Sequence, residues 1–276
     1  MNINCKGTLI DLTEPKVMGI LNVTPDSFFD GGRFQDEKAI LKQVKLLIEE
    51  GANFIDIGGY SSRPGAPDIS EKEELQRVLP VFEMLSVEFP DVLLSIDTFR
   101  SEIAGACIDA GAAIVNDITA GKVDENIFSV VAEKNTPYVM MHMQGNPKTM
   151  QQQPNYDNIV QEILLFFSER IAKARSFGIN DIILDPGFGF GKTIAHNYEL
   201  LSKLALFKFN ELPLLIGVSR KSMIWKVLDI SANEALNGTS VLHTIALQKG
   251  AQILRVHDVK EAKECVKLIT QLKKHL

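Results

Sequence analysis

A short apolar run that ends in polar residues recurs eight times along this chain, and an amphipathic segment separates most of these runs from the next. Apolar runs of this length are typical of buried strands, whereas apolar residues three and four positions apart are typical of helices. We predict strands at 17–21, 54–57, 92–96, 113–115, 138–141, 182–185, 214–218 and 253–257. Alternating strands and helices indicate a parallel sheet, and eight such units within 276 residues indicate a TIM (β/α)8 barrel.

The first residues and the domain organisation complete the predicted fold. Residues 1–16 contain two short segments around Lys6-Gly7, which predict an N-terminal β-hairpin with strands at 3–5 and 8–12. The first helix of the barrel is predicted to follow Asp36. No change of composition marks a linker, so we expect a single domain over residues 1–276. An open doubly wound sheet is the alternative, because counting strands does not establish that the sheet closes.

The composition excludes several classes of function. A formal net charge of -6 argues against the basic face of a nucleic-acid-binding protein. No apolar run approaches the roughly 20 residues that cross a bilayer, and the N-terminus lacks the pattern of a secretory signal. Three scattered cysteines, Cys5, Cys107 and Cys265, predict packing in a reducing compartment rather than disulfides or a zinc site. We therefore expect a cytoplasmic protein with no nucleic-acid or membrane partner.

Polar residues stand at the end of each predicted strand. The C-terminal ends of the strands carry the active site in TIM barrels, so these residues are expected to share one rim. They are Asn22, Asp56, Asp97, Asn116, His142, Asp185, Ser219, Lys221, Arg255 and His257. For Asp56 and His142 an ordinary structural role at a strand end is the better interpretation. Lys221 has an equally plain alternative as a solvated loop lysine.

The residue types at this rim indicate two kinds of ligand group. Asp97, Asn116 and Asp185 offer donors and acceptors that suit the edge of a nitrogen heterocycle with an amino group. The cationic or protonatable residues, Arg63, Arg255 and His257, would balance a phosphate or diphosphate. The expected ligand therefore has a heterocyclic end and an anionic end.

Residues 182–193 combine a buried strand with a glycine-rich turn. The strand ends on Asp185, and glycine and phenylalanine then alternate from Gly187 to Gly191. Glycines let the backbone approach a flat ligand, and phenylalanine rings offer a face for stacking. Gly191-Lys192-Thr193 is similar to the end of a phosphate-binding P-loop, but Pro186 stands where that motif requires glycine.

Eight segments, taken in order, resemble dihydropteroate synthases along nearly the whole chain. They are MGILNVTPDSF at 18–28, SRPG at 62–65, SIDT at 95–98, NDI at 116–118, MHMQG at 141–145, LDPGFGFGK at 184–192, GVSRKS at 217–222 and RVHD at 255–258. The resemblance implies a pterin-binding TIM barrel and a transferase of folate biosynthesis. In that reaction the amino group of 4-aminobenzoate displaces diphosphate from (7,8-dihydropterin-6-yl)methyl diphosphate, which gives 7,8-dihydropteroate.

The resemblance also implies a role for each matching residue. The pterin would be held by Asp97, Asn116, Asp185 and Lys221, with Ile118, Met141, Phe190 and Gly217 around it. The diphosphate would bind Arg63, Arg255 and His257, with Asn22 as a ligand of a Mg²⁺ cofactor. The 4-aminobenzoate slot would involve Phe28, Ser62, Pro64, Gly189, Ser219 and Ser222, together with Phe190 and Lys221. A homodimer and sensitivity to sulfonamides are implied in the same way.

Two departures and two alternatives accompany this interpretation. Ser62 stands where the family usually has threonine, and Tyr60 replaces a residue that is often acidic or small. Both lie in the expected aminobenzoate loop. A pterin-dependent methyltransferase is one alternative, although it would have no use for Arg63 and the Arg255–His257 pair. A non-catalytic pterin-binding paralogue is the other, and it predicts binding of pterin without turnover.

Overall fold

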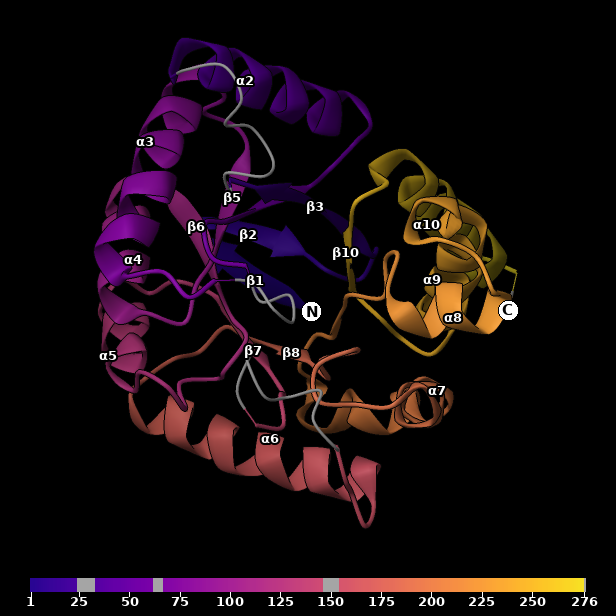
Figure 1. Ribbon diagram of the computed structural model, residues 1–276. Helices are drawn as coiled ribbons and strands as arrows, with labels where there is room; N and C mark the ends of the chain where they lie inside the picture. Colours follow the sequence, from indigo (N-terminus) through magenta and orange to yellow (C-terminus); the bar gives the residue numbers. More distant parts are fainter. Residues whose placement is uncertain (24–32, 62–66, 146–153, 276) are drawn as a thin grey trace.

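The computed structural model describes residues 1–23, 33–61, 67–145 and 154–275. Eight strands of the described residues form one sheet in the order β8-β7-β6-β5-β4-β3-β10-β9, and the paired strands run parallel. Their bounds are β3 Lys16–Asn22, β4 Phe54–Gly58, β5 Leu93–Asp97, β6 Ala112–Asp117, β7 Tyr138–Met141, β8 Ile182–Asp185, β9 Leu215–Ile216 and β10 Ile253–Val256. The strands therefore follow one another around a ring, with β10 returning to β3 (Figure 1).

The ring closes between β8 and β9 through a single parallel bridge. Leu184 pairs with Leu214, and the Leu184 N–H donates to the Pro213 carbonyl at 2.8 Å. The Leu214 N–H is taken by the Gln252 side chain at 2.8 Å, so it makes no ladder bond. β9 is therefore shorter at its start than the predicted strand at 214–218, and it ends at Ile216. The arrangement confirms the barrel and excludes the doubly wound sheet.

Helices surround the barrel, as Figure 1 shows. The α-helices are α2 Arg33–Glu49, α3 Glu71–Glu88, α4 Ser101–Asp109, α5 Asn126–Glu133, α6 Ile159–Ser176, α7 Ile194–Ser202, α8 Ser222–Leu228, α9 Leu236–Gln248 and α10 Val259–Lys273. Two 3₁₀ helices, η1 Leu204–Glu211 and η2 Ala232–Glu234, lie between them in the chain. Helix α2 begins before the predicted start after Asp36, because the first turn of a helix need not contribute to its apolar stripe.

Side chains inside the barrel change from apolar to polar along the strands. Successive residues of a strand point to opposite faces, so every second residue faces the interior. On β4, Phe54 lies in a buried apolar cluster, whereas Asp56, two residues later on the same face, has a charged side chain. Ile183 and Asp185 repeat the change on β8. One end of the barrel is therefore filled with hydrocarbon, and the end toward which the strands run is lined with polar groups.

The N-terminal hairpin covers the apolar end. Strands β1 (Asn2–Cys5) and β2 (Thr8–Asp11) pair antiparallel, and Lys6 and Gly7 both have positive φ in the turn, 53° and 83°. A two-residue turn with this geometry matches the twist of a hairpin. Ile3 and Cys5 pack among the strand residues of the apolar end. All three cysteines are buried free thiols, as the sequence predicted.

Candidate active site

Asp56 is the most connected charged group inside the barrel. Its side chain is fully buried and accepts hydrogen bonds from Ser95 Oγ at 2.5 Å, Asn116 Nδ2 at 2.9 Å and Arg255 Nε at 2.6 Å. Since the Asn116 amide nitrogen is directed at Asp56, the other amide atom, an acceptor oxygen, is turned elsewhere. Asp56 therefore fixes both Asn116 and Arg255. This is a larger structural role than the sequence predicted.

Asp97 lies on the other side of Arg255. The Arg255 Nη2 group donates to Asp97 Oδ2 at 2.7 Å, so one guanidinium bridges two carboxylates. Burial raises the pKa of Asp97 to about 7, although the Arg255 charge opposes that shift. The side chain remains 22% exposed, which leaves its carboxylate accessible to a ligand.

Asp185, at the end of β8, and Lys221, after β9, influence each other's charge. Burial raises the pKa of Asp185 and the Lys221 charge opposes this shift, whereas burial lowers the pKa of Lys221 to about 8 against the pull of Asp185. Asp185 Oδ1 accepts the Gly187 N–H at 2.7 Å. The Lys221 ammonium donates to the Phe188 carbonyl and lies 4.6 Å from the centre of the Phe190 ring.

Ser219 and His257 meet at the ends of β9 and β10. Ser219 Oγ lies 3.0 Å from His257 Nδ1 and accepts the His257 backbone N–H at 3.2 Å. His257 is exposed, and Ser219 is buried. The next residues along the chain also pair, because Arg220 binds Asp258 through two nitrogens, at 2.7 and 2.9 Å. A protonatable ring is thus held at the mouth of the barrel.

Comparison with known proteins identifies the family of this chain. The family described as "Pterin binding enzyme" matches residues 18–257. Dihydropteroate synthase from Escherichia coli K12 is 46% identical over 271 residues, which are 98% of this chain and 95% of that protein. The chain belongs to the dihydropteroate synthase family.

Solved dihydropteroate synthase structures share the fold. The Yersinia pestis enzyme in complex with a sulfonamide drug has a TM-score of 0.93 at 44% identity, and the match covers 99% of this chain and 100% of that chain. The Xanthomonas albilineans enzyme with 4-aminobenzoic acid has a TM-score of 0.91 at 39% identity, covering 99% and 98%. Both similarities extend over the whole barrel and its polar end.

The residues expected to line the pterin site of a dihydropteroate synthase come together here. Ile118 and Met141 share a small buried cluster with Phe99 and Met143, against which Tyr60 and Phe190 pack. A Cβ built on Gly217 would lie 3.8 Å from Lys221 Nζ and 4.0 Å from Arg255 Cβ, which places this glycine between the two cations. A Cβ on Gly189 would meet the Lys221 side chain at 3.1 Å. Ser222 is the first residue of α8, next to Lys221.

Several expected residues of the substrate loops cannot be placed. Phe28, Ser62, Arg63 and Pro64 lie outside the described residues. Asn22, the proposed metal ligand, ends β3 in register with Gly58 and is half-buried. Among the described residues, no group of three or more His, Cys, Asp or Glu side chains forms a metal cage.

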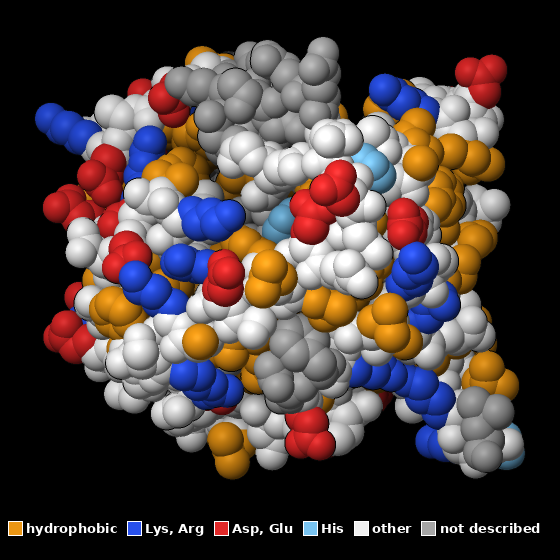
Figure 2. Space-filling view, turned by 90° about the horizontal axis from the view of Figure 1, so that it is seen from below, with side chains coloured by type: hydrophobic (Ala, Val, Ile, Leu, Met, Phe, Trp, Pro, Cys, Tyr) orange, Lys and Arg blue, Asp and Glu red, His pale blue; other side chains and the backbone are white. Residues whose placement is uncertain are grey.

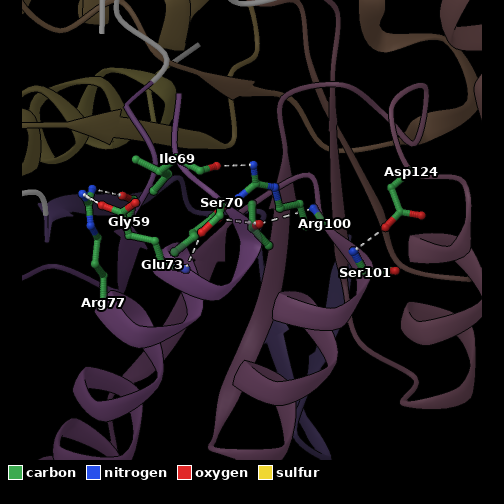
Figure 3. Close-up of polar contacts among 10 residues, drawn as sticks. Gly59, Ile69, Ser70, Glu73, Arg77, Arg100, Ser101 and Asp124 are labelled. Atoms are coloured by element: carbon green, nitrogen blue, oxygen red, sulfur yellow. Dashed lines mark hydrogen bonds and ion pairs between the residues drawn. The ribbon is translucent and has the colours of Figure 1, made fainter. Parts of the chain in front are cut away.

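The chain on either side of residues 62–66 is held by two arginines (Figure 3). Arg77 donates to the Gly59 carbonyl at 3.0 Å, and Arg100 donates to the Ile69 carbonyl at 2.7 Å. Arg100 also pairs with the buried Glu74 at 2.7 Å. The departure at Tyr60 belongs to this assembly, because its ring stands edge-on to Phe99 at 5.2 Å and lies 5.6 Å from the Arg100 guanidinium.

Sequence reasoning placed Asp56 at the rim but gave it only an ordinary structural role, and it assigned no role to Lys192. A signal for Asp56 exists, since it stands between Ile55 and Ile57 in a buried strand, in register with Ser95 on β5. Lys192 is only 3% exposed, whereas a lysine in a glycine-rich loop normally reaches solvent.

Proposed function

We propose that this protein is a dihydropteroate synthase that joins (7,8-dihydropterin-6-yl)methyl diphosphate to 4-aminobenzoate and releases diphosphate. The observation that carries the proposal is the convergence of Asp97, Asn116, Asp185 and Lys221 on one end of the barrel, beside Arg255. These groups come from five different strands or strand ends, as is typical of a TIM-barrel active site.

The pterin ring fits the carboxylates and the amide. A carboxylate that faces a ring nitrogen and its adjacent amino group can accept two parallel hydrogen bonds, and charged hydrogen bonds contribute roughly 1.5–3 kcal/mol each. Asp185 is assigned this role, with Asn116 and Asp97 on the other ring edge. Lys221 would donate to a ring acceptor, and Ile118, Met141 and Phe190 would contact the ring faces. Asp56 does not need to touch the pterin, because its contribution is to orient Asn116 and Arg255.

The diphosphate is assigned to the cationic side of the site. His257 stands exposed at the barrel mouth. Arg255 adds a positive charge, and its guanidinium is also paired with the carboxylates of Asp56 and Asp97. Arg63 completes the proposed set. Mg²⁺ fits this site, since it retains several waters and binds through one or two protein oxygens plus substrate phosphates, and Asn22 offers such an oxygen. When bound, the metal would neutralise charge on the leaving diphosphate.

The reaction then needs positioning and charge rather than a covalent nucleophile. The bond between the pterin methylene carbon and the diphosphate oxygen breaks, and the electron pair leaves with diphosphate. The 4-aminobenzoate nitrogen forms the new bond to that carbon and loses one proton. The carboxylates of Asp97 and Asp185 would stabilise positive charge that spreads into the pterin ring as the bond breaks. The 4-aminobenzoate slot is assigned to Gly189, Phe190, Ser219, Lys221 and Ser222, with Phe28, Ser62 and Pro64.

Turnover of the two substrates tests the proposal. Purified protein with pterin diphosphate, 4-aminobenzoate and Mg²⁺ should form dihydropteroate and diphosphate in equal amounts. Omitting 4-aminobenzoate should abolish dihydropteroate formation, and a sulfonamide should compete with it. Binding of the pterin without any product would instead indicate a non-catalytic paralogue. Methyl transfer from a methyltetrahydrofolate to a corrinoid would indicate the methyltransferase.

The lysine in the pterin site predicts an alkaline limit to activity. The pKa of Lys221 is lowered to about 8 by burial, so the ammonium is present below pH 8 and is lost as the pH rises through that value. We expect kcat/KM for the pterin diphosphate to fall about tenfold per pH unit above pH 8. Lys221→Arg should move this fall to higher pH, because guanidinium stays protonated. If kcat/KM of that variant falls at the same pH as in wild type, Lys221 is not the group whose deprotonation causes the fall.

We also propose a cytoplasmic homodimer. No described helix is long and apolar enough to cross a membrane. Aliphatic side chains are exposed on the three neighbouring helices α8, α9 and α10, and apolar side chains gather on that side of the molecule (Figure 2). They are Val227, Leu228, Val241, Leu268 and Leu272. Light scattering should give twice the chain mass, and the variant with Val241→Glu and Leu268→Glu should give the chain mass.

A further inference from the structure

Lys192 is a buried lysine to which the assigned reaction gives no role. It follows the glycine loop (residues 187–191), and its ammonium reaches four acceptors. These are the carbonyls of Gly187 at 2.8 Å, Phe190 at 3.0 Å and His142 at 3.3 Å, and His142 Nδ1 at 3.0 Å. Two neighbouring loops, after β7 and after β8, therefore converge on one nitrogen atom. A buried cation must be compensated in this way, because losing its hydration costs several kcal/mol.

The His142 ring serves Lys192 as an acceptor. Burial lowers the pKa of Lys192 well below its usual value, and the Asp185 charge opposes that shift. While Lys192 is protonated it has only donors, so Nδ1 then accepts and the neutral ring carries its proton on Nε2. Burial, together with the charges of Lys192 and Lys122, lowers the pKa of His142 to about 2. The ring is held edge-on to Phe166 at 4.9 Å. His142, the residue after β7, thus presents an acceptor of fixed direction to Lys192.

The glycine loop has the conformation that this convergence requires. Gly187, Gly189 and Gly191 all have positive φ, at 70°, 82° and 61°. A Cβ on Gly187 would lie 1.9 Å from the His142 carbonyl oxygen, so backbone packs directly against backbone there. The Gly189 N–H is taken by Asn197 at 2.7 Å and the Gly191 carbonyl by Tyr156 at 2.8 Å. The Lys192 ammonium donates to the carbonyls of Gly187 and Phe190, and the loop turns between these two residues.

The opposite face of the same loop contacts Lys221. The carbonyl of Phe188 accepts from the Lys221 ammonium, and the Phe190 ring lies 4.6 Å from it. Lys192 binds the carbonyls of Gly187 and Phe190, which lie on either side of Phe188 in the loop. Phe190 also carries the ring that lies near Lys221. A shift of the loop would therefore move both the aromatic ring and the carbonyl that locate Lys221.

We propose that Lys192 is a positioning residue for 4-aminobenzoate: by drawing Gly187, Phe190 and His142 to one point, it fixes the glycine loop and, through it, the Phe190 ring and the Lys221 ammonium. This inference rests on the proposed function, because Phe190 and Lys221 are assigned to the aminobenzoate slot there. The loop also contacts part of the proposed pterin site, since Asp185 accepts the Gly187 N–H and Lys221 is assigned to both substrates. Asp97 and Asn116, on β5 and β6, supply the remaining pterin contacts, so the pterin half should be affected less.

The first test compares substrate constants in Lys192→Met. The KM for 4-aminobenzoate should rise at least tenfold, whereas the Kd for pterin, measured by calorimetry, should rise by a smaller factor. The matched control is Lys122→Met, which removes a lysine 4.6 Å from the Phe166 ring without touching the glycine loop, and should leave both constants unchanged. A purely structural role would lower kcat with the folded fraction and leave KM unchanged. That result would overturn the proposal.

Chemical rescue of Lys192→Ala and a comparison of two substitutions at His142 provide a second test. In Lys192→Ala, n-propylamine replaces the missing atoms and should restore the KM in a saturable way, whereas propan-1-ol and tetramethylammonium should not. His142→Asn keeps an acceptor near the position of Nδ1 and should retain a KM near that of wild type, whereas His142→Leu should raise it tenfold. Equal KM values in the two histidine variants would contradict the proposal, even if the Lys192 variants do not fold.

Failure of this inference can be separated from failure of the proposed function. If wild-type protein makes no dihydropteroate, the function is wrong, and calorimetric binding of 4-aminobenzoate with pterin and diphosphate present still reports on Lys192. If wild-type protein turns over and Lys192→Met has the same KM, only the role of Lys192 is wrong.

Discussion

Asp185→Asn is expected to lower kcat/KM for the pterin diphosphate at least tenfold, which corresponds to about 1.4 kcal/mol of transition-state stabilisation. Asparagine keeps an oxygen that can accept the Gly187 N–H, now 2.7 Å from Asp185, so the glycine loop should be preserved. What is lost is the negative charge that acts on Lys221 and that is assigned to the pterin edge. Steady-state kinetics at pH 7 with saturating 4-aminobenzoate measure the effect.

A carboxylate at the other end of the barrel provides the control. Asp181 lies just before β8 and accepts the Asn4 N–H at 3.0 Å, near the hairpin. Asp181→Asn makes the same chemical change away from the proposed site, so kcat/KM should stay within twofold of wild type. Equal losses in the two variants would show that the Asp185 effect comes from folding rather than from pterin binding.

Asp56→Ala is expected to lower the free energy of unfolding by about 3 kcal/mol, the cost of leaving a buried charge without its partner. Arg255 would lose the carboxylate 2.6 Å from its Nε, and Asn116 would lose the acceptor 2.9 Å from its amide nitrogen. Urea unfolding at pH 7 measures the change. Asp97 continues to pair with Arg255, so the loss stays at the lower end of the range for buried pairs.

The comparison variant for Asp56→Ala is Glu49→Gln. Glu49 pairs with Lys45 at 3.9 Å on the exposed face of α2, where such pairs contribute about 0.5 kcal/mol or less. A loss in Asp56→Ala no larger than in Glu49→Gln would mean that Asp56 does not hold the polar network together.

The fold could be predicted because its signals are local. Each strand is marked by its own apolar run, and each strand end by its own polar residue, so eight units and the site end of the barrel follow from short windows of sequence. Closure is different. It depends on the Leu184–Leu214 bridge and on the Gln252 side chain, which no local pattern indicates.

Partners across the barrel could not be predicted for the same reason. Arg255 and Asp56 are 199 residues apart in sequence, and only the closed ring brings β4 next to β3 and β3 next to β10. The sequence therefore predicted Arg255 as a ligand-binding cation but did not predict that two of its nitrogens bond to Asp56 and Asp97. The buried position of Lys192 could not be predicted either, because its acceptors are mostly backbone carbonyls of two loops.

The most direct test is a crystal structure of the protein with (7,8-dihydropterin-6-yl)methyl diphosphate and Mg²⁺, in the absence of 4-aminobenzoate. The amino edge of the ring should lie within hydrogen-bond distance of Asp185 and the opposite edge near Asn116, with the diphosphate on the side of Arg255 and His257. A pterin bound outside the polar end of the barrel, or turned so that its diphosphate faces Asp185, would contradict the proposed site.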